Sequence, residues 1–272
     1  MEDDIISHLS DNVVDNILMF LPLRDAVRTS ALSQKWRHNW ETLPQLVFDS
    51  DFEESLKQYP AKNELLFTIY QILLLHRAQI RGHGNPEVQN GRKINMLEVF
   101  GCLPSIEYLH VDYYLLMILA AGDIPERFLT PFNLLKTLIL REISLDEVAE
   151  FSLALCLIKS SPHLQKLEIS VDECPNINSD GAVEFLAVQN RSDISLDKVQ
   201  EVEMLDLTGR GLQMGFVKLL LAKSPMLERM HVHPLQGIST NEELRLLTEI
   251  TRFCWPSAVA EIIYSGLNHV NS

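Results

Sequence analysis

Cysteines and basic residues are both scarce in this 272-residue sequence. The formal net charge of −14 argues against general nucleic-acid binding, because that binding draws much of its affinity from Lys and Arg contacts to phosphates. The cysteines are scattered and form no Cys-x-x-Cys pair, which excludes the usual spacings of zinc sites and thioredoxin-like motifs. We expect most of them to be buried, reduced thiols. They are Cys102, Cys156, Cys174 and Cys254.

Long hydrophobic runs are also missing. The longest run, Leu65 to Leu75, is interrupted by Thr68 and Gln71 and falls short of the ~18 residues that a membrane helix requires. Acidic residues at Glu2 to Asp4 stand where a secretory signal needs positive charge. The sequence contains no P-loop, Gly-x-Ser-x-Gly or Cys/His nucleophile arrangement. We therefore expect a protein of the nucleus or cytoplasm that has no cofactor, no metal and no catalytic site.

A front segment, Ser7 to Asp49, has the pattern of short helices followed by a strand. Ser10 is a favourable N-cap, and Asp11 lies in the first turn, where the helix dipole favours an anion. Pro22 ends this first helix, because the residue before a proline is biased away from helical angles. Apolar residues recur at helical spacing and form one broad stripe. They are Val13, Val14, Ile17, Leu18 and Leu21.

The rest of the segment completes a pattern that resembles a plant F-box. A third helix from Ser33 carries Trp36 and Trp40, and a short strand covers Leu46 to Phe48. Ser10 departs from the family, which usually has proline there. The resemblance implies docking onto a Skp-family adaptor and, through it, onto a cullin-based ubiquitin ligase. The matching positions are Leu9, Val13-Val14, Ile17-Leu18, Leu21-Pro22, Asp25, Thr29-Ser30, Leu32-Ser33, Trp36-Arg37, Trp40, Leu43-Pro44 and Phe48-Asp49.

Three helices this short cannot cover all their apolar side chains internally. We expect Trp36 to hold them together and other apolar residues to supply much of the adaptor contact. Two alternatives stay open: a helical cap that packs only on the rest of the chain, and a helix-turn-helix with Ser33 to Asn39 as its DNA-recognition helix. The predicted adaptor contacts are Leu9, Val13, Ile17, Leu21 and Pro22.

The rear of the chain repeats an apolar-x-x-apolar-x-apolar pattern. The last positions of its copies are 29, 29, 38 and 25 residues apart. Leucine-rich repeats have periods of about 20–29 residues, so the long interval predicts an insertion around Cys174 to Asn190. The five copies are Ile106-Leu109-Val111, Leu135-Leu138-Leu140, Leu164-Leu167-Ile169, Val202-Leu205-Leu207 and Leu227-Met230-Val232.

Helical patterns lie between these predicted strands, over Asp146 to Lys159 and Gly215 to Lys223. Repeated helix–strand units bury their apolar faces on their neighbours, which predicts parallel strands with helices outside. A compact α/β sandwich is the alternative. Val199 to Pro234, together with Ala258 to Ser265, resembles the FBD domain of plant F-box/FBD/leucine-rich-repeat proteins.

The predicted fold class is therefore α/β: an N-terminal three-helix F-box, a short leucine-rich-repeat-like array of parallel strands and helices, and an FBD-type unit. The expected boundaries are 1–50 for the F-box, 51–96 for a helical connector and loop, 97–192 for the repeat-like region, 193–266 for the FBD-like domain and 267–272 for a tail. The family usually carries more repeats where the loop Gly82 to Asn95 stands here, so we expect a shortened array.

Two further patterns favour other functions only weakly. The glycine run from Gly209 to Gly215 follows a strand, but Met214 stands where a dinucleotide fingerprint needs glycine. His231-x-His233 places two imidazoles on one strand face without an evident third metal ligand. The sequence thus predicts a non-catalytic substrate receptor of an SCF-type (Skp–cullin–F-box) ubiquitin ligase, which binds an unknown target protein. An interaction protein outside any ligase, and an α/β nucleotide-binding enzyme, are the alternatives.

Overall fold

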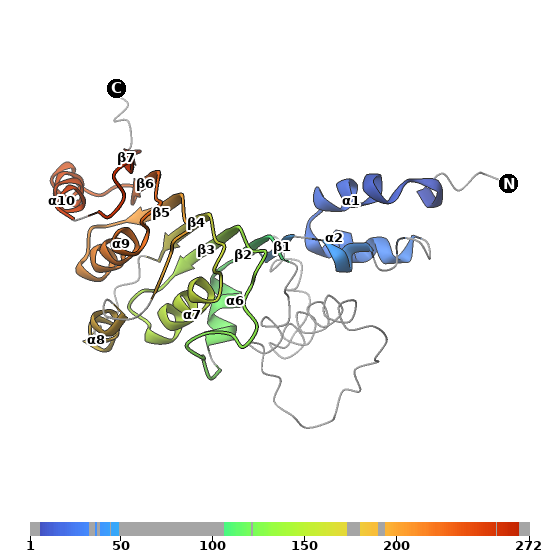
Figure 1. Ribbon diagram of the computed structural model, residues 1–272, viewed down its shortest axis with the longest axis horizontal. Helices are drawn as coiled ribbons and strands as arrows, with labels where there is room; N and C mark the ends of the chain where they lie inside the picture. The colour runs from blue at the N-terminus through green and yellow to red at the C-terminus, as the bar shows by residue number, and fades with distance from the viewer. Residues whose placement is uncertain are drawn as a thin grey trace.

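The computed structural model describes residues 6–32, 36, 39–43, 45–48, 106–120, 122–172, 180–189, 194–253 and 255–266. Within these residues, seven strands form one sheet in which each strand is parallel to its neighbours and the strand order follows the chain (Figure 1). The strands are β1 (Gln45–Phe48), β2 (Tyr108–Val111), β3 (Thr137–Ile143), β4 (Lys166–Val171), β5 (Glu201–Leu207), β6 (Arg229–Pro234) and β7 (Glu261–Tyr264).

Helices connect the strands from β2 onward, and each of these helices packs on the next along one side of the sheet (Figure 1). This confirms the predicted α/β class with parallel strands. The two predicted helices are present, although the second begins earlier, at Gly211. The connecting helices are α6 (Tyr113–Ala120), α7 (Val148–Lys159), α8 (Asp180–Gln189), α9 (Gly211–Lys223) and α10 (Thr240–Thr251).

The front helices lie beyond β1, at the opposite end of the sheet from α10 (Figure 1). Of the predicted third helix, which begins at Ser33 and is ended by Pro44, only Trp36 and residues 39–43 fall within the described residues, and a 3₁₀ helix covers Asn39–Thr42. The predicted connector and its loop, Gly82 to Asn95, lie outside the described residues. The front elements are η1 (Ile6–His8), α1 (Asp11–Met19), α2 (Leu23–Arg28), η2 (Thr29–Ala31) and η3 (Asn39–Thr42).

Each repeat buries three apolar side chains at the predicted spacing, but the prediction for β5 was wrong by three residues. The strand register pairs Leu167 with Val202 and aligns the next inward position with Met204, so the β5 copy begins at Val199. Leu205, which was predicted to be inward, is only half-buried. The last positions of the copies are therefore 29, 29, 35 and 28 residues apart. The insertion between the β4 and β5 copies is therefore shorter than predicted. The other three intervals differ from one another by at most one residue.

The strand of the front segment is also a copy of this repeat. Leu43, Leu46 and Phe48 have the same spacing and are buried. Leu46 pairs with Leu109, and Phe48 pairs with Val111 on β2. The sheet therefore runs without interruption across the predicted boundaries at residues 50 and 192. The division into an F-box, a repeat region and an FBD-like unit stays a prediction.

Gly209 and Gly215 have structural reasons of their own. Gly209 has φ = +76° in the turn between β5 and α9, a conformation that glycine adopts without a steric penalty. A Cβ on Gly215 would lie 2.5 Å from Leu186 Cδ2, so this glycine allows α8 to pack closely on α9. These two glycines therefore serve the β5–α9 turn and the contact between α8 and α9.

Two β-bulges recur at equivalent positions, one on β3 and one on β5. The register shifts between Leu140 and Ile143 and again between Met204 and Leu207. In each bulge an acidic residue has a left-handed backbone, Glu142 with φ = 53° and Asp206 with φ = 62°. Asp206 Oδ2 also accepts a 2.7 Å hydrogen bond from the hydroxyl of Ser170 on β4.

We expect Glu142→Gly to raise the free energy of unfolding by about 0.5–1 kcal/mol, because glycine removes the Cβ clash of a left-handed residue at some entropic cost. Asp206→Gly should gain less, since aspartate tolerates this conformation better and Ser170 would lose its acceptor. Urea denaturation of both variants measures the difference. A loss of stability in Glu142→Gly would contradict the assignment of strain to this bulge.

Candidate protein-interaction surfaces

Helix α1 divides its apolar residues between two faces. Val14 and Leu18 are fully buried, whereas Val13 and Ile17 are 42% and 39% exposed. Because the members of each pair are four residues apart, each pair lies along its own side of the helix. The single stripe predicted from the sequence is therefore two stripes, and only Val14 and Leu18 pack into the core.

Phe20 extends the exposed stripe by one turn. It is the helix C-cap, retains helical backbone angles and is 88% exposed. Val13, Ile17 and Phe20 have the spacing of one helix face and are called the α1 surface below. Of the other predicted contact residues, Leu9 and Leu21 are half-buried against the core, and Pro22 is exposed.

The interior of the front segment is organised around its tryptophans. Trp36 and Trp40 are almost fully buried, and Trp36 Nε1 donates a hydrogen bond of 3.2 Å to the carbonyl of Ile6. This contact agrees with the predicted role of Trp36. Ser10 occupies the predicted N-cap position with an extended backbone, but its side chain accepts no hydrogen bond from the helix. Ser10 therefore has the backbone conformation of an N-cap, but its side chain does not form the expected hydrogen bond to the helix.

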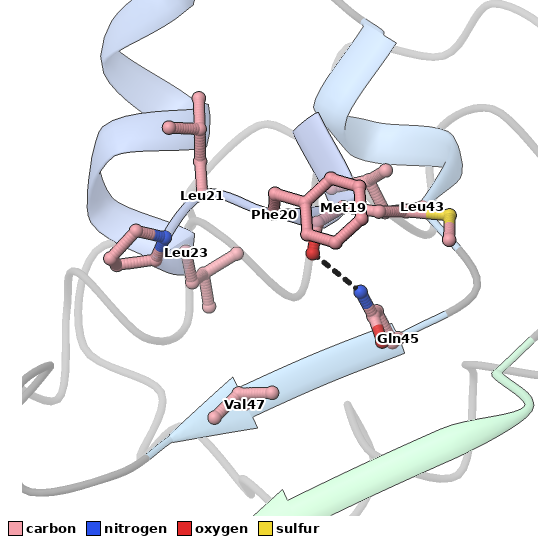
Figure 2. Close-up of a pocket in the computed structure, with 8 residues that line it drawn as sticks. Met19, Phe20, Leu21, Leu23, Leu43, Gln45 and Val47 are labelled. Atoms are coloured by element: carbon pink, nitrogen blue, oxygen red, sulfur yellow. Dashed lines mark hydrogen bonds between the residues drawn. The ribbon is translucent and has the colours of Figure 1, made fainter. Parts of the chain in front are cut away.

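A groove of about 230 Å³ separates the α1–α2 turn from strand β1 (Figure 2). The side-chain amide of Gln45 on β1 donates a 2.9 Å hydrogen bond to the carbonyl of Met19, which joins the two walls. The side chains that line the groove are apolar except for that of Gln45, and the groove includes part of the α1–α2 turn. It is lined by Met19, Phe20, Leu21, Pro22, Leu23, Leu43, Gln45 and Val47.

The face of the sheet opposite the repeat core changes character along its length. On the first three strands, aligned outward positions carry the uncharged residues Gln45, Tyr108 and Thr137. On the next four strands the same row carries alternating charges. These are Lys166, Glu201, Arg229 and Glu261.

The charged half of this face is paired within the protein. Glu201 accepts from Lys166 Nζ at 2.7 Å and from Arg229 Nη2 at 3.0 Å. The hydrogen bond from Lys166 is the main cause that lowers the pKa of Glu201, with Arg229 adding to it. The same bond raises the pKa of Lys166. These charges are thus stabilised by one another.

His231 and His233 lie side by side on β6. Their rings are nearly parallel with centroids 6.5 Å apart, and His233 Nε2 lies 3.1 Å from Glu203 Oε1. Across the described part of the chain, no three His, Cys, Asp or Glu side chains are arranged to hold a metal ion. No helix among the described residues is long and apolar enough to cross a membrane.

Comparison with known proteins agrees with this geometry. A model of the F-box domain matches residues 6–47, which include the α1 surface and most of β1. One F-box/FBD/LRR-repeat protein of Arabidopsis thaliana is 44% identical over 78 residues, which cover 28% of this chain and 19% of that protein. The chain is thus similar to plant F-box/FBD/LRR-repeat proteins, most closely over its F-box.

A second Arabidopsis thaliana F-box/FBD/LRR-repeat protein is 23% identical over 253 residues, covering 88% of this chain and 54% of its own length. An FBD-associated F-box protein from the same plant is 45% identical over 49 residues, or 18% of this chain and 10% of that protein. The chain thus spans about half, or less than half, of the length of these relatives. No solved structure matches it.

The F-box match contains all five residues that the sequence predicted as adaptor contacts. The match does not test their role, which stays a prediction. Helical periodicity placed Val13 and Ile17 correctly on an apolar helix but could not separate them from Val14 and Leu18. Phe20 was missed because it lies just after the last helical residue, Met19, where the helical spacing used for the prediction ends.

The ion-pair row on β4 to β6 was also missed, although the sequence contained a signal for it. Lys166, Glu201 and Arg229 each precede the middle buried residue of their repeat. An alignment of the repeats in the correct register puts them in one row. The shifted β5 register prevented that alignment.

We expect Glu201→Gln to lower the free energy of unfolding by about 0.5–1 kcal/mol at neutral pH, because two cationic partners lose their anion. The folded-state pKa of Glu201 is lowered, so its contribution is present above the ordinary value of 4.5 and is lost as the pH falls through the folded-state pKa. The difference between variant and wild type should therefore shrink in acid.

Urea denaturation over a series of pH values checks this expectation. Glu107→Gln is the matched control, because Glu107 pairs with Lys136 at 2.7 Å but both side chains are about half exposed. The control should change stability little at any pH. A difference for Glu201→Gln that does not depend on pH would contradict the ionic origin.

Proposed function

We propose that this protein is a substrate-receptor subunit of an SCF-type ubiquitin ligase, in which the F-box binds a Skp-family adaptor and, through it, a cullin. The observation that carries the proposal is an F-box whose first helix presents Val13 and Ile17 outward while Val14 and Leu18 hold it in the core. Val13 and Ile17 remain 42% and 39% exposed, so part of this apolar face is not covered by the described residues of the chain. An adaptor would supply that cover.

Burial gives the proposed contact its driving force. Removing apolar surface from water contributes about 25 cal/mol per Å². The loss of translational and side-chain freedom on binding offsets much of this gain. The buried area of the five proposed contacts therefore does not by itself determine the affinity. The proposed contacts are Leu9, Val13, Ile17, Leu21 and Pro22.

In this proposal the repeat array binds the target protein, and the transfer of ubiquitin belongs to other subunits. F-box proteins are generally non-catalytic, so no reacting group is required of this chain. The outward face of the parallel strands supports the assignment, since most of its described side chains, such as Tyr108 and Thr137, are only partly buried. The nucleus and cytoplasm are the proposed locations.

We expect Ile17→Asp to weaken binding to a plant Skp-family adaptor by about tenfold or more, because a desolvated carboxylate would replace an apolar contact. Calorimetric titration of the intact chain with purified adaptor measures this affinity. Leu244→Asp is the matched control, since Leu244 is an exposed leucine on α10 at the far end of the sheet. The control should bind as the wild type does.

An interaction protein outside any ligase is the alternative function, and the same titration separates the two. Wild-type chain that binds no adaptor would contradict the receptor proposal and favour this alternative. Equal affinities for Ile17→Asp and the wild type would leave adaptor binding in place but remove α1 from the interface.

A further inference from the structure

The groove lies between the α1–α2 turn and strand β1. One wall is the α1–α2 turn, and the other is the outward side of β1, with Val47 and Gln45 (Figure 2). Leu23 and Leu43 are themselves buried, but they still line the space. Among the described residues, β1 is the first strand of the sheet and pairs only with β2, so no other described strand covers this end.

Size and chemistry limit what can occupy this groove. Its volume is about 230 Å³. An apolar cavity of about 150 Å³ holds a benzene-sized ring, so this groove suits one large aromatic or aliphatic side chain. The side-chain amide of Gln45 donates one N–H to the carbonyl of Met19. The other seven residues that line the groove have apolar side chains. The groove thus favours an apolar occupant.

We propose that this groove receives one large apolar side chain of the Skp-family adaptor, which extends the adaptor interface from α1 onto strand β1. The inference rests on the proposed function. It adds Val47 and Gln45 of the sheet to a contact that the sequence placed only on the front helices.

Continuity with the α1 surface identifies the adaptor as the occupant. Phe20 belongs to both features: it ends the exposed face of Val13 and Ile17, and it lines the groove. Leu21 and Pro22 line the groove as well and lie among the proposed adaptor contacts. A partner that covers the α1 surface therefore reaches the groove without a break.

This placement has a consequence for the ligase. An adaptor side chain that contacts Val47 touches the same strand whose inward residues, Leu46 and Phe48, are packed in the repeat core. The adaptor would then contact both the α1–α2 turn and strand β1, the two elements that the Gln45–Met19 hydrogen bond joins. These two contacts would fix the orientation of the target-binding face relative to the adaptor.

Filling the groove tests the proposal. We expect Val47→Trp to weaken adaptor binding by about tenfold or more in the titration described above, because the indole would take the place of the incoming side chain. Phe20→Ala removes one wall at an exposed position and should also weaken binding. Val259→Trp is the matched control, since Val259 is an exposed valine just before β7. It should leave the affinity unchanged.

The outcomes separate this inference from the proposed function. Loss of binding by Val47→Trp and Phe20→Ala, with Val259→Trp normal, supports the groove as an adaptor site. Should Val47→Trp unfold, the smaller change Val47→Phe decides, because Phe20 belongs to the α1 surface as well as to the groove. Normal binding by Phe20→Ala and by folded Val47→Trp, while Ile17→Asp binds poorly, would overturn the groove proposal and leave the receptor proposal intact. Wild-type chain without adaptor affinity would overturn both. Retained adaptor affinity with loss of a target protein would assign the groove to the target and also overturn the proposal.

Discussion

Strands β1 to β6 depend on their neighbours to bury the same inward position. Leu46, Leu109, Leu138, Leu167, Val202 and Met230 lie in one ladder across adjacent strands, and each is at most 1% exposed. A single repeat cannot bury its apolar face alone, so the array gains stability by stacking. Because β1 belongs to this ladder, the F-box is anchored to the array through shared core packing.

The same constraint leaves the other surfaces available for binding. Inward positions must be apolar and tightly packed. On the outward face, the row through Gln45, Tyr108 and Thr137 is uncharged. Its continuation on β4 to β6 is paired within the protein. At the β1 end, the α1 surface and the groove beside Val47 lie next to the sheet. The proposed adaptor contact and the proposed target face thus meet at one strand, which gives the receptor a fixed geometry.

Much of the fold could be predicted from local pattern. The spacing of Leu164, Leu167 and Ile169 requires only that one side of a strand be buried, and it identified the parallel array. The position of the β5 copy failed because Val202, Leu205 and Leu207 satisfy the same spacing as Val199, Val202 and Met204. Only pairing with Leu167 decides between them. The groove was beyond prediction, since it arises from how the α1–α2 turn and β1 approach one another in space.

The measurement that tests this account most directly is scanning calorimetry of the intact chain and of Leu46→Ala. Truncating a fully buried leucine should cost about 2–5 kcal/mol. If β1 shares the core of the array, the chain unfolds in one transition, and the substitution lowers its midpoint as a whole. Two separate transitions, of which Leu46→Ala shifts only one, would show that the F-box and the array are stabilised independently and would contradict the account.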